Sequence, residues 1–358
     1  VVRAEPMNDI SGHGVRVTDI AAAVSTYNFC SHSAPLLYAD RANTNGWLYM
    51  IESHAPMERW KRLQDGRGRT QAATREQLAS ARDAAIICDL PEYALLSFEG
   101  EDAEACLQGQ LSSDVRALTA DRCQLATYNS PKGRVLATLT LWRTDTGFLA
   151  QLPVAIAEAI RKRLSMYVLR AKVRIESRTD RLARIGLGGP EAERVLTAAG
   201  VAPPARIFDL VRAKAVSEGG RRFTIDWVMR FAGNRYELIV GGDESAVAIW
   251  RKLQECGAMP ADFAAWRWLT LRAGIAEVGP QTQDELVAQM LNYELIGGIS
   301  FDKGCYPGQE IVARTQYRGT IKRRSVLAHA TDSVEPAPGT SIFSDASGDQ
   351  AIGMVVNA

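Results

Sequence analysis

Eight consecutive residues, Lys303 to Glu310, bring together the side chains of this sequence that are best suited to chemistry. They read Lys-Gly-Cys-Tyr-Pro-Gly-Gln-Glu. Pro307 suits the first turn of a helix, and we expect that helix over residues 309–318. Cys305 would then lie just before a helix N-terminus and two residues from Lys303. Both the helix dipole and the ammonium favour a thiolate, so we expect a lowered pKa and a reactive cysteine.

The rest of this motif supports the same interpretation, and its members are Gly304, Tyr306, Gly308, Gln309 and Glu310. Gly304 allows the backbone to approach a ligand closely or to take a positive φ. Tyr306 offers a flat face, and the last two side chains offer hydrogen-bonding groups that can position the loop. The alternative is a small buried cysteine in a tight turn, because free cysteine is commonly a buried hydrophobe. The residues alone leave both interpretations of Cys305 open.

A basic stretch follows the motif directly. Five basic residues and no acidic one occur between positions 314 and 324, namely Arg314, Arg318, Lys322, Arg323 and Arg324. One interpretation is a site for an anion such as phosphate, a polyglutamate tail or RNA. The other is a solvated face at a helix C-terminus, where the dipole favours cations. The sequence leaves both interpretations open.

Mixed hairpins and helices must position these residues. We expect strands over 93–98, 122–128, 134–142, 147–152, 173–177, 182–187, 222–228 and 236–240, helices over 102–111, 153–169, 190–199 and 244–255, and a short helix opening at 74–77. The Asn-Ser-Pro-Lys-Gly turn at 129–133 joins two strands as a hairpin. The glycine-rich run at 186–189 lacks the third glycine of a dinucleotide fingerprint, because Glu191 stands there. The pattern predicts an α+β fold of packed sandwiches rather than a doubly wound parallel sheet.

Composition limits the classes of function. A net charge of +1, from 42 basic and 41 acidic residues, argues against a protein whose whole surface binds nucleic acid or anionic membrane. Six cysteines without a CxxC pair disfavour a zinc ribbon or a self-contained iron–sulfur ligand set, and we expect no metal site. Since no apolar run approaches the roughly 20 residues of a membrane span, and no signal-peptide pattern occurs, we expect a cytoplasmic protein with reduced thiols and no membrane partner.

Further short runs accompany the motif in a fixed order along the chain. They are Leu107–Leu111 with Asp114, Lys132–Arg134, Leu271–Ile275, Gln289–Glu294 and the motif with its continuation to Arg314. Together they resemble the YgfZ family, folate-binding relatives of the glycine-cleavage aminomethyltransferase (T-protein), over about residues 80–358. The resemblance implies a three-domain ring of the aminomethyltransferase folate-binding type, with tetrahydrofolate in the central hole. We therefore expect an atypical N-terminal extension at 1–72, for which disorder is one alternative, a folate-binding α+β domain pair at 73–321, and a truncated C-terminal β-barrel at 322–358.

The resemblance also implies which residues carry the function. Its signature cysteine corresponds to Cys305, beside Lys303, and its folate pocket suggests Arg272, Gln289 and Asn292 as neighbours of the pterin or its tail. The implied role is assembly or repair of iron–sulfur clusters in client enzymes, with an indirect effect on tRNA modification. Folate and the client or assembly proteins are the expected partners, and we expect a monomer.

The chain departs from true aminomethyltransferases just beyond the hairpin turn. Those enzymes carry paired aspartates there, whereas this sequence has Leu136, Ala137 and Thr138. A glutamate of the T-protein pocket falls on Asn234. The sequence therefore predicts that the scaffold is kept while the classical aminomethyl chemistry is lost. Two alternatives stay open: a folate-dependent one-carbon transferase with another acid or base, and a module that docks RNA or a partner.

Overall fold

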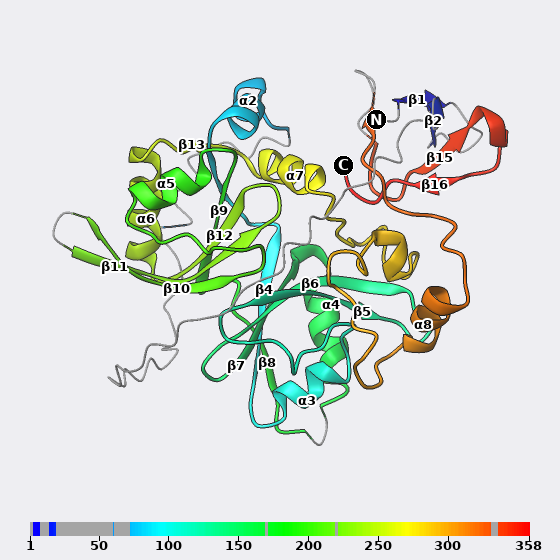
Figure 1. Cartoon of the computed structure of the whole chain (residues 1–358), viewed down its shortest axis with the longest axis horizontal. Helices are drawn as coiled ribbons and strands as arrows, with labels where there is room; N and C mark the ends of the chain where they lie inside the picture. Colours follow the sequence, from blue (N-terminus) through cyan, green and yellow to red (C-terminus); the bar gives the residue numbers. More distant parts are fainter. Residues whose placement is uncertain are drawn as a thin grey trace, which may run out of the picture.

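The structure is a computed structural model that describes residues 3–7, 14–18, 60, 72–168, 171–218, 221–330 and 336–358 (Figure 1). These residues contain three β-sheets with flanking helices. Two of the sheets lie against each other and frame the candidate site, and the third combines strands from the first and last parts of the chain. None of the helices in the described part of the chain is long and apolar enough to cross a membrane.

The sheet that contains the hairpin has five antiparallel strands. In spatial order they are β5 (Cys123–Asn129), β6 (Val135–Arg143), β7 (Gly147–Pro153), β4 (Tyr93–Glu99) and β8 (Arg174–Ser177). Helices α3 (Ala103–Gln108) and α4 (Val154–Ser165) cover its outer face through an aliphatic core. In α4 the buried residues Ile156, Ile160 and Leu164 recur at every fourth position, so one stripe of the helix faces the sheet.

The second sheet has six strands. In spatial order they are β10 (Leu210–Glu218), β11 (Arg221–Phe231), β12 (Arg235–Gly241), β9 (Leu182–Gly188), β3 (Ile86–Asp89) and β13 (Met259–Pro260). Helices α5 (Ala192–Ala198) and α6 (Asp243–Glu255) pack on it, and α7 (Phe263–Arg272) lies on β3 and β9 with α2 (Arg75–Asp83) beside it. Gly186 allows this close packing, because an added Cβ would lie 2.7 Å from the Trp266 ring.

An apolar core joins the inner faces of these two sheets. Trp142 of β6 and Trp227 of β11 meet edge to face with their ring centroids 6.3 Å apart. Leu95, Leu149 and Ile239 are buried in the same cluster. Because both faces of each sheet are covered, the strands are apolar on both sides, and polar side chains within them are exceptions that need an explanation.

The third sheet changes the expectation for the first 72 residues. Its strand order is β14 (His329–Ala330), β1 (Arg3–Met7), β2 (Gly14–Thr18), β15 (Ser341–Ser344) and β16 (Gly353–Met354). The described strands of the expected extension therefore share a sheet with the C-terminal segment. Trp60 also belongs to the fold, because it is buried against Trp250 with ring centroids 5.4 Å apart. The rest of 1–71 lies outside the described residues, and the domain boundaries and the C-terminal barrel stay predictions.

The predicted elements largely coincide with the observed ones. The hairpin, the strands over 93–98, 147–152 and 182–187 and the four main helices are present, and Thr74 and Gln77 form a capping box on α2. Helix α4 ends at Ser165 rather than at 169. Strands β3 and β10 and helix α7 were not predicted from the sequence. The last part of the chain also contains the 3-10 helices η2 (Ala288–Leu291) and η3 (Asp345–Ser347) and the helix α8 (Gln309–Tyr317), which matches the helix expected over 309–318.

Candidate functional site

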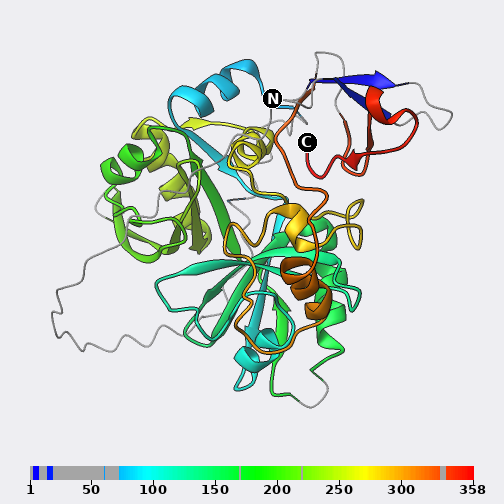
Figure 2. The same cartoon turned by 45° about the vertical axis from the view of Figure 1, so that its right-hand side comes forward.

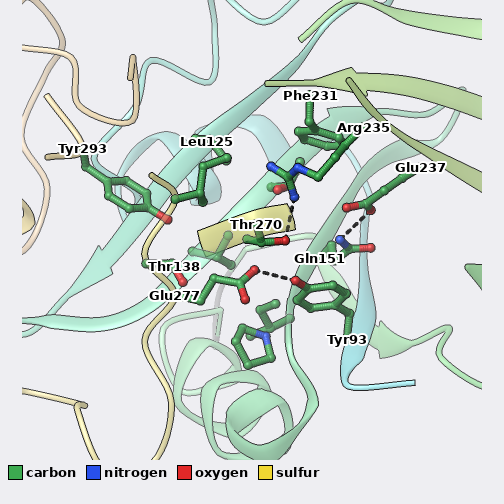
Figure 3. Close-up of a pocket in the computed structure, with 15 residues that line it drawn as sticks. Tyr93, Leu125, Thr138, Gln151, Phe231, Arg235, Glu237, Thr270, Glu277 and Tyr293 are labelled. Atoms are coloured by element: carbon green, nitrogen blue, oxygen red, sulfur yellow. Dashed lines mark hydrogen bonds between the residues drawn. The ribbon is translucent and has the colours of Figure 1, made fainter. Parts of the chain in front are cut away.

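A pocket lies where the two facing sheets meet the segment that follows α7 (Figure 3). Its polar and aromatic lining comprises Tyr93 of β4, Thr138 and Thr140 of β6, Gln151 of β7, Phe231, Arg235 and Glu237 of β11 and β12, Thr270 of α7, and Glu277 and Tyr293 beyond it. The cavity volume is about 30 Å³. That is room for one or two water molecules, so a larger ligand must move side chains apart.

Arg235 is the cationic centre of this pocket. The side chain is 3% exposed, and burial lowers the pKa of its guanidinium. Its Nη1 donates to the Thr270 hydroxyl at 2.7 Å, its Nε donates to the carbonyl of Ala232 at 3.0 Å, and the guanidinium stacks on Trp266 at 5.3 Å from the ring centroid. Its buried Nη2 has no hydrogen-bond partner among the described residues. A buried donor without an acceptor is costly, so Nη2 is suited to a ligand oxygen or a water.

Two carboxyl groups approach the same space. Glu237 accepts a hydrogen bond from Gln151 Nε2 at 2.7 Å, and burial raises the pKa of Glu237 to about 7. Glu277 accepts from the Tyr93 hydroxyl at 2.8 Å, and burial raises its pKa as well. The buried Oε1 of Gln151 has no partner in the described part of the chain. Figure 3 shows these groups turned toward one another, so the pocket offers both donors and acceptors in a dry setting.

The three residues expected to contact a pterin do not line this pocket. Arg272 is exposed and stacks on a tryptophan ring of its own helix at 4.8 Å. Gln289 is fully buried, but its amide donates to a backbone carbonyl of α8 at 2.7 Å. Asn292 has a left-handed backbone (φ 61°), and its amide donates to the carbonyl of Ser325 at 2.9 Å. Gln289 and Asn292 connect parts of the fold, and the polar groups that face the cavity come from β4, β6, β7, β12, α7 and the segment after α7.

Lys303 anchors the motif loop. Its Nζ donates to the carbonyls of Gln108, Leu111 and Ser113 at 2.7, 2.6 and 2.9 Å. An ammonium has three donors, so none is left for a hydrogen bond to the thiol of Cys305. The expected effect of the lysine charge on that thiol stays a prediction. Burial lowers the pKa of Lys303 to about 8. The ammonium thus ties the loop to the segment after α3.

Two glycines allow the motif loop to pack closely against the hairpin turn. Gly308, at φ +75°, is the N-cap of α8, and an added Cβ would lie 2.4 Å from the Cα of Gly133. Gly133, at φ +73°, is equally restricted, because its Cβ would lie 2.6 Å from Ile311. Gly304 is different, since no atom lies within 4 Å of the position of its Cβ. Gly304 does not take a positive φ, and the approach of a ligand to it stays a prediction, while Gly308 makes the close contact within the fold.

Cys305 is exposed beside this open position. The alternative of a buried cysteine in a tight turn is therefore wrong. Cys88 and Cys123 show the contrast, because both are buried and burial raises the pKa of their thiols well above the ordinary value. Tyr306 is buried next to Lys303, with the ammonium 5.2 Å from its ring centroid, while Glu310 is exposed. The fold holds the loop on both sides of Cys305 and leaves the thiol accessible.

The basic stretch divides into two parts. Arg314, Arg318, Lys322 and Arg323 are exposed, and none of them forms a salt bridge within the described residues. Arg324 instead lies 2.7 Å from the carboxylate of Glu294, whose side chain is only 5% exposed, and it also donates to Asn292 Oδ1 at 3.0 Å. Arg324 is therefore committed to the fold. The other four cations are available to an anionic partner, and of these Arg323 also donates to the carbonyl of Ala351 at 3.4 Å.

Comparisons with known proteins identify the family. The model of the GCVT N-terminal domain matches residues 21–296. A tRNA-modifying protein YgfZ from Escherichia coli O7:K1 is 31% identical over 271 residues, which are 75% of this chain and 79% of that protein. The chain belongs to the YgfZ family of GCVT-domain proteins. The tRNA-modifying protein YgfZ of Escherichia fergusonii is 30% identical over the same shares. A crystal structure of the glycine cleavage system aminomethyltransferase T from Bartonella henselae has a TM-score of 0.60 at 17% identity, covering 73% of this chain and 74% of that one, and confirms the aminomethyltransferase fold.

For this YgfZ-family chain, sequence reasoning missed the polar groups of the pocket. Gln151 interrupts the apolar strand Phe148–Leu152, and Glu237 interrupts the apolar strand Tyr236–Val240. Amide and carboxyl side chains inside otherwise buried strands are rare, and they mark either a buried network or a ligand site. This interruption was the signal that the sequence offered.

Proposed function

We propose that this protein binds tetrahydrofolate in the pocket between its two facing sheets. The observation that carries the proposal is the buried Nη2 of Arg235, an orphan donor beside the carboxyl groups of Glu237 and Glu277. The edge of a pterin ring carries N–H donors next to a carbonyl acceptor. Two carboxyl groups and the Oε1 of Gln151 can accept from those donors, and the guanidinium can donate to the carbonyl.

The pocket residues therefore fit the ligand that the fold implies, provided that the cavity opens. A cavity of about 30 Å³ does not admit a ring system, so lining side chains must move when folate binds. Arg235→Met should abolish tetrahydrofolate binding to the full chain while circular dichroism shows that the variant is folded. A folded variant that binds as well as the wild type would place folate elsewhere.

The β6 wall of the pocket supports a role other than classical aminomethyl transfer. Thr138 lines the cavity where the sequence departs from the transferases, and its hydroxyl accepts a hydrogen bond from the backbone of Val278 at 3.1 Å. This wall offers a hydroxyl that is already engaged and no carboxylate. The proposed use of folate is therefore as a bound ligand of an assembly factor.

Glu237 favours a second candidate, a folate-dependent one-carbon transferase. A carboxyl whose pKa is raised to about 7 can take up and release a proton at neutral pH, as a general acid or base must. Turnover of methylene-tetrahydrofolate with an amine donor, abolished by Glu237→Gln even at saturating folate, would establish this activity. Tight folate binding without turnover would leave the assembly role as the better account.

We further propose that Cys305 acts on an iron–sulfur client or assembly protein, as a nucleophile or as a transient ligand to its cargo. The support is positional, because the thiol is exposed on a loop fixed by Lys303 on one side and Gly308 on the other. A soluble cytoplasmic monomer with an indirect link to tRNA modification, through an iron–sulfur enzyme, completes the proposal.

The test of the cysteine is made in cells that lack the native protein. Cys305→Ala should lose the activity of iron–sulfur client enzymes, whereas Cys106→Ala, at a half-buried free thiol on α3, should retain it. Full client activity with Cys305→Ala at equal protein level would exclude a chemical role for the thiol.

A further inference from the structure

The outer face of α8 and the chain after it form a basic surface. Arg314 and Arg318 lie one helical turn apart, and Lys322 and Arg323 follow in the extended segment. All four are exposed and have no acidic partner in the part of the chain that the structure describes. These four cations outnumber Glu310, the exposed acid in the first turn of α8, so an acidic partner would bind here with favourable electrostatics.

The same region also exposes large apolar side chains. Of the eight that are exposed among the described residues, four lie here: Leu295 (61%), Tyr317 (70%), Val326 (62%) and Leu327 (51%). Single exposed hydrophobic residues are ordinary, but a concentration of them next to basic residues is typical of a protein interface.

Contacts in the fold join these two groups. The Glu294–Arg324 salt bridge, at 2.7 Å, fixes the segment that carries Val326 and Leu327 beside the one that carries Leu295. The amide of Ser325 donates to the carbonyl of Met290 at 2.7 Å, which strengthens the same junction. Figures 1 and 2 both show α8 next to the segment around η2, consistent with their contacts.

The surface also reaches the motif loop. Tyr317 packs edge to face on Phe301 with ring centroids 5.9 Å apart, and Phe301 precedes Cys305 by four residues. No atom lies within 4 Å of a Cβ added at Gly304, so there is open space next to the exposed thiol of Cys305. A protein bound on α8 would therefore lie next to Cys305.

We propose that this surface, made of the four cations and the four apolar side chains, docks an acidic protein and presents it to Cys305. The inference deepens the proposed function, on which it rests, by naming the chemistry of the partner's surface: carboxylates surrounding an apolar centre. RNA fits less well. Phosphates would pair with the arginines and a base could stack on Tyr317, but Leu295, Val326 and Leu327 are aliphatic and would stay in water. A protein surface with an apolar centre can bury them.

The test places a photoreactive benzoylphenylalanine at Tyr317 of the full chain in cells, with Tyr167, which is 53% exposed near the end of α4, as the matched control position. We expect a nuclease-resistant protein adduct at Tyr317 alone, cross-linked through an acidic segment. Its yield should fall at least tenfold in Arg314→Glu/Arg318→Glu. It should not fall in Arg75→Glu/Arg251→Glu, which reverses two exposed arginines on α2 and α6.

The purified pair then decides the assignment. Arg314→Glu/Arg318→Glu should raise the dissociation constant at least tenfold, and reversing the cross-linked acids of the partner should restore binding. An adduct that nuclease removes would assign the surface to RNA, and an equal adduct at Tyr167, or no protein adduct at Tyr317, would overturn the proposal. Tetrahydrofolate binding and client activity are measured in parallel. If the wild type binds tetrahydrofolate but no protein docks on it, only the proposed surface is contradicted, whereas a wild type that does not bind tetrahydrofolate contradicts the proposed function.

Discussion

Replacing Lys303 with methionine removes the anchor of the motif loop. The ammonium is 8% exposed and donates to three backbone carbonyls. Leaving each carbonyl without a donor costs about 2 kcal/mol, or about 6 kcal/mol together. Methionine also removes the cost of burying the charge, which is about 3 kcal/mol, since the pKa of Lys303 is lowered from 10.5 to about 8. The net expectation is a loss of about 3 kcal/mol in the free energy of unfolding.

Thermal unfolding at pH 7, followed by near-ultraviolet circular dichroism, measures this loss. A loss of about 3 kcal/mol should lower Tm by about 4 °C in a chain of this size. Lys132→Met is the matched control, because Lys132 is exposed in the hairpin turn. Equal Tm values for the two variants would refute the reasoning, because the carbonyls would then not depend on the ammonium.

The stability difference between the wild type and Lys303→Met should also depend on pH. The pKa of Lys303 in the folded chain, about 8, lies below its ordinary 10.5. Between these values the folded state binds fewer protons than the unfolded state, so the contribution of Lys303 to stability rises with pH. The stability difference between the wild type and Lys303→Met should widen from pH 8 to pH 10. A difference that stays constant over that range would contradict the burial of a charged amine.

Three further predictions concern other parts of the account. Gly308→Ala should destabilise the chain by about 2 kcal/mol or more, because it adds strain at positive φ to a 2.4 Å clash, while Gly304→Ala should change stability by less than about 0.5 kcal/mol in urea titrations. The pKa of Glu237 is raised from 4.5 to about 7, so between these pH values the folded state holds a proton that the unfolded state has lost, and the free energy of unfolding falls as pH rises. Glu237→Gln should remove this fall of about 3 kcal/mol. A variant with the same dependence of stability on pH as the wild type would contradict the raised pKa. Trp60→Ala should cost about 3–5 kcal/mol, since Trp60 is buried against Trp250, and a neutral effect in thermal unfolding would show that its segment lies outside the core.

The sequence predicts the elements that have a local signature and misses those that depend on tertiary packing. The hairpin at 129–133 and helix α4 follow from turn chemistry and from a helical apolar stripe, which are local properties. Strand β10 and helix α7 lack such a signature. Helix α7 is apolar on several sides because it lies between a sheet and α2, so its pattern has little contrast between faces.

For a related reason, the sequence predicted the motif loop of the candidate site but not the pocket. The motif from Lys303 to Glu310 is contiguous, so its composition identifies it, and its exposed cysteine was expected to be reactive. The pocket instead gathers Tyr93, Gln151, Arg235 and Glu277 from four separate parts of the chain. Which polar groups face one cavity depends on sheet order and packing, and a single sequence does not encode that in any local window. The anchoring role of Lys303 was not predicted because the carbonyls that it binds lie about two hundred residues away in sequence.

Calorimetric titration of the full chain with tetrahydrofolate in reducing buffer tests the central claim most directly. We expect saturable binding by the wild type and by Cys305→Ala alike, because the exposed thiol is not part of the pocket lining. We also expect binding at least tenfold weaker in Glu237→Gln, which replaces a buried acceptor with an amide. No binding by the wild type, or unchanged binding by Glu237→Gln, would contradict the claim that this pocket is a folate site.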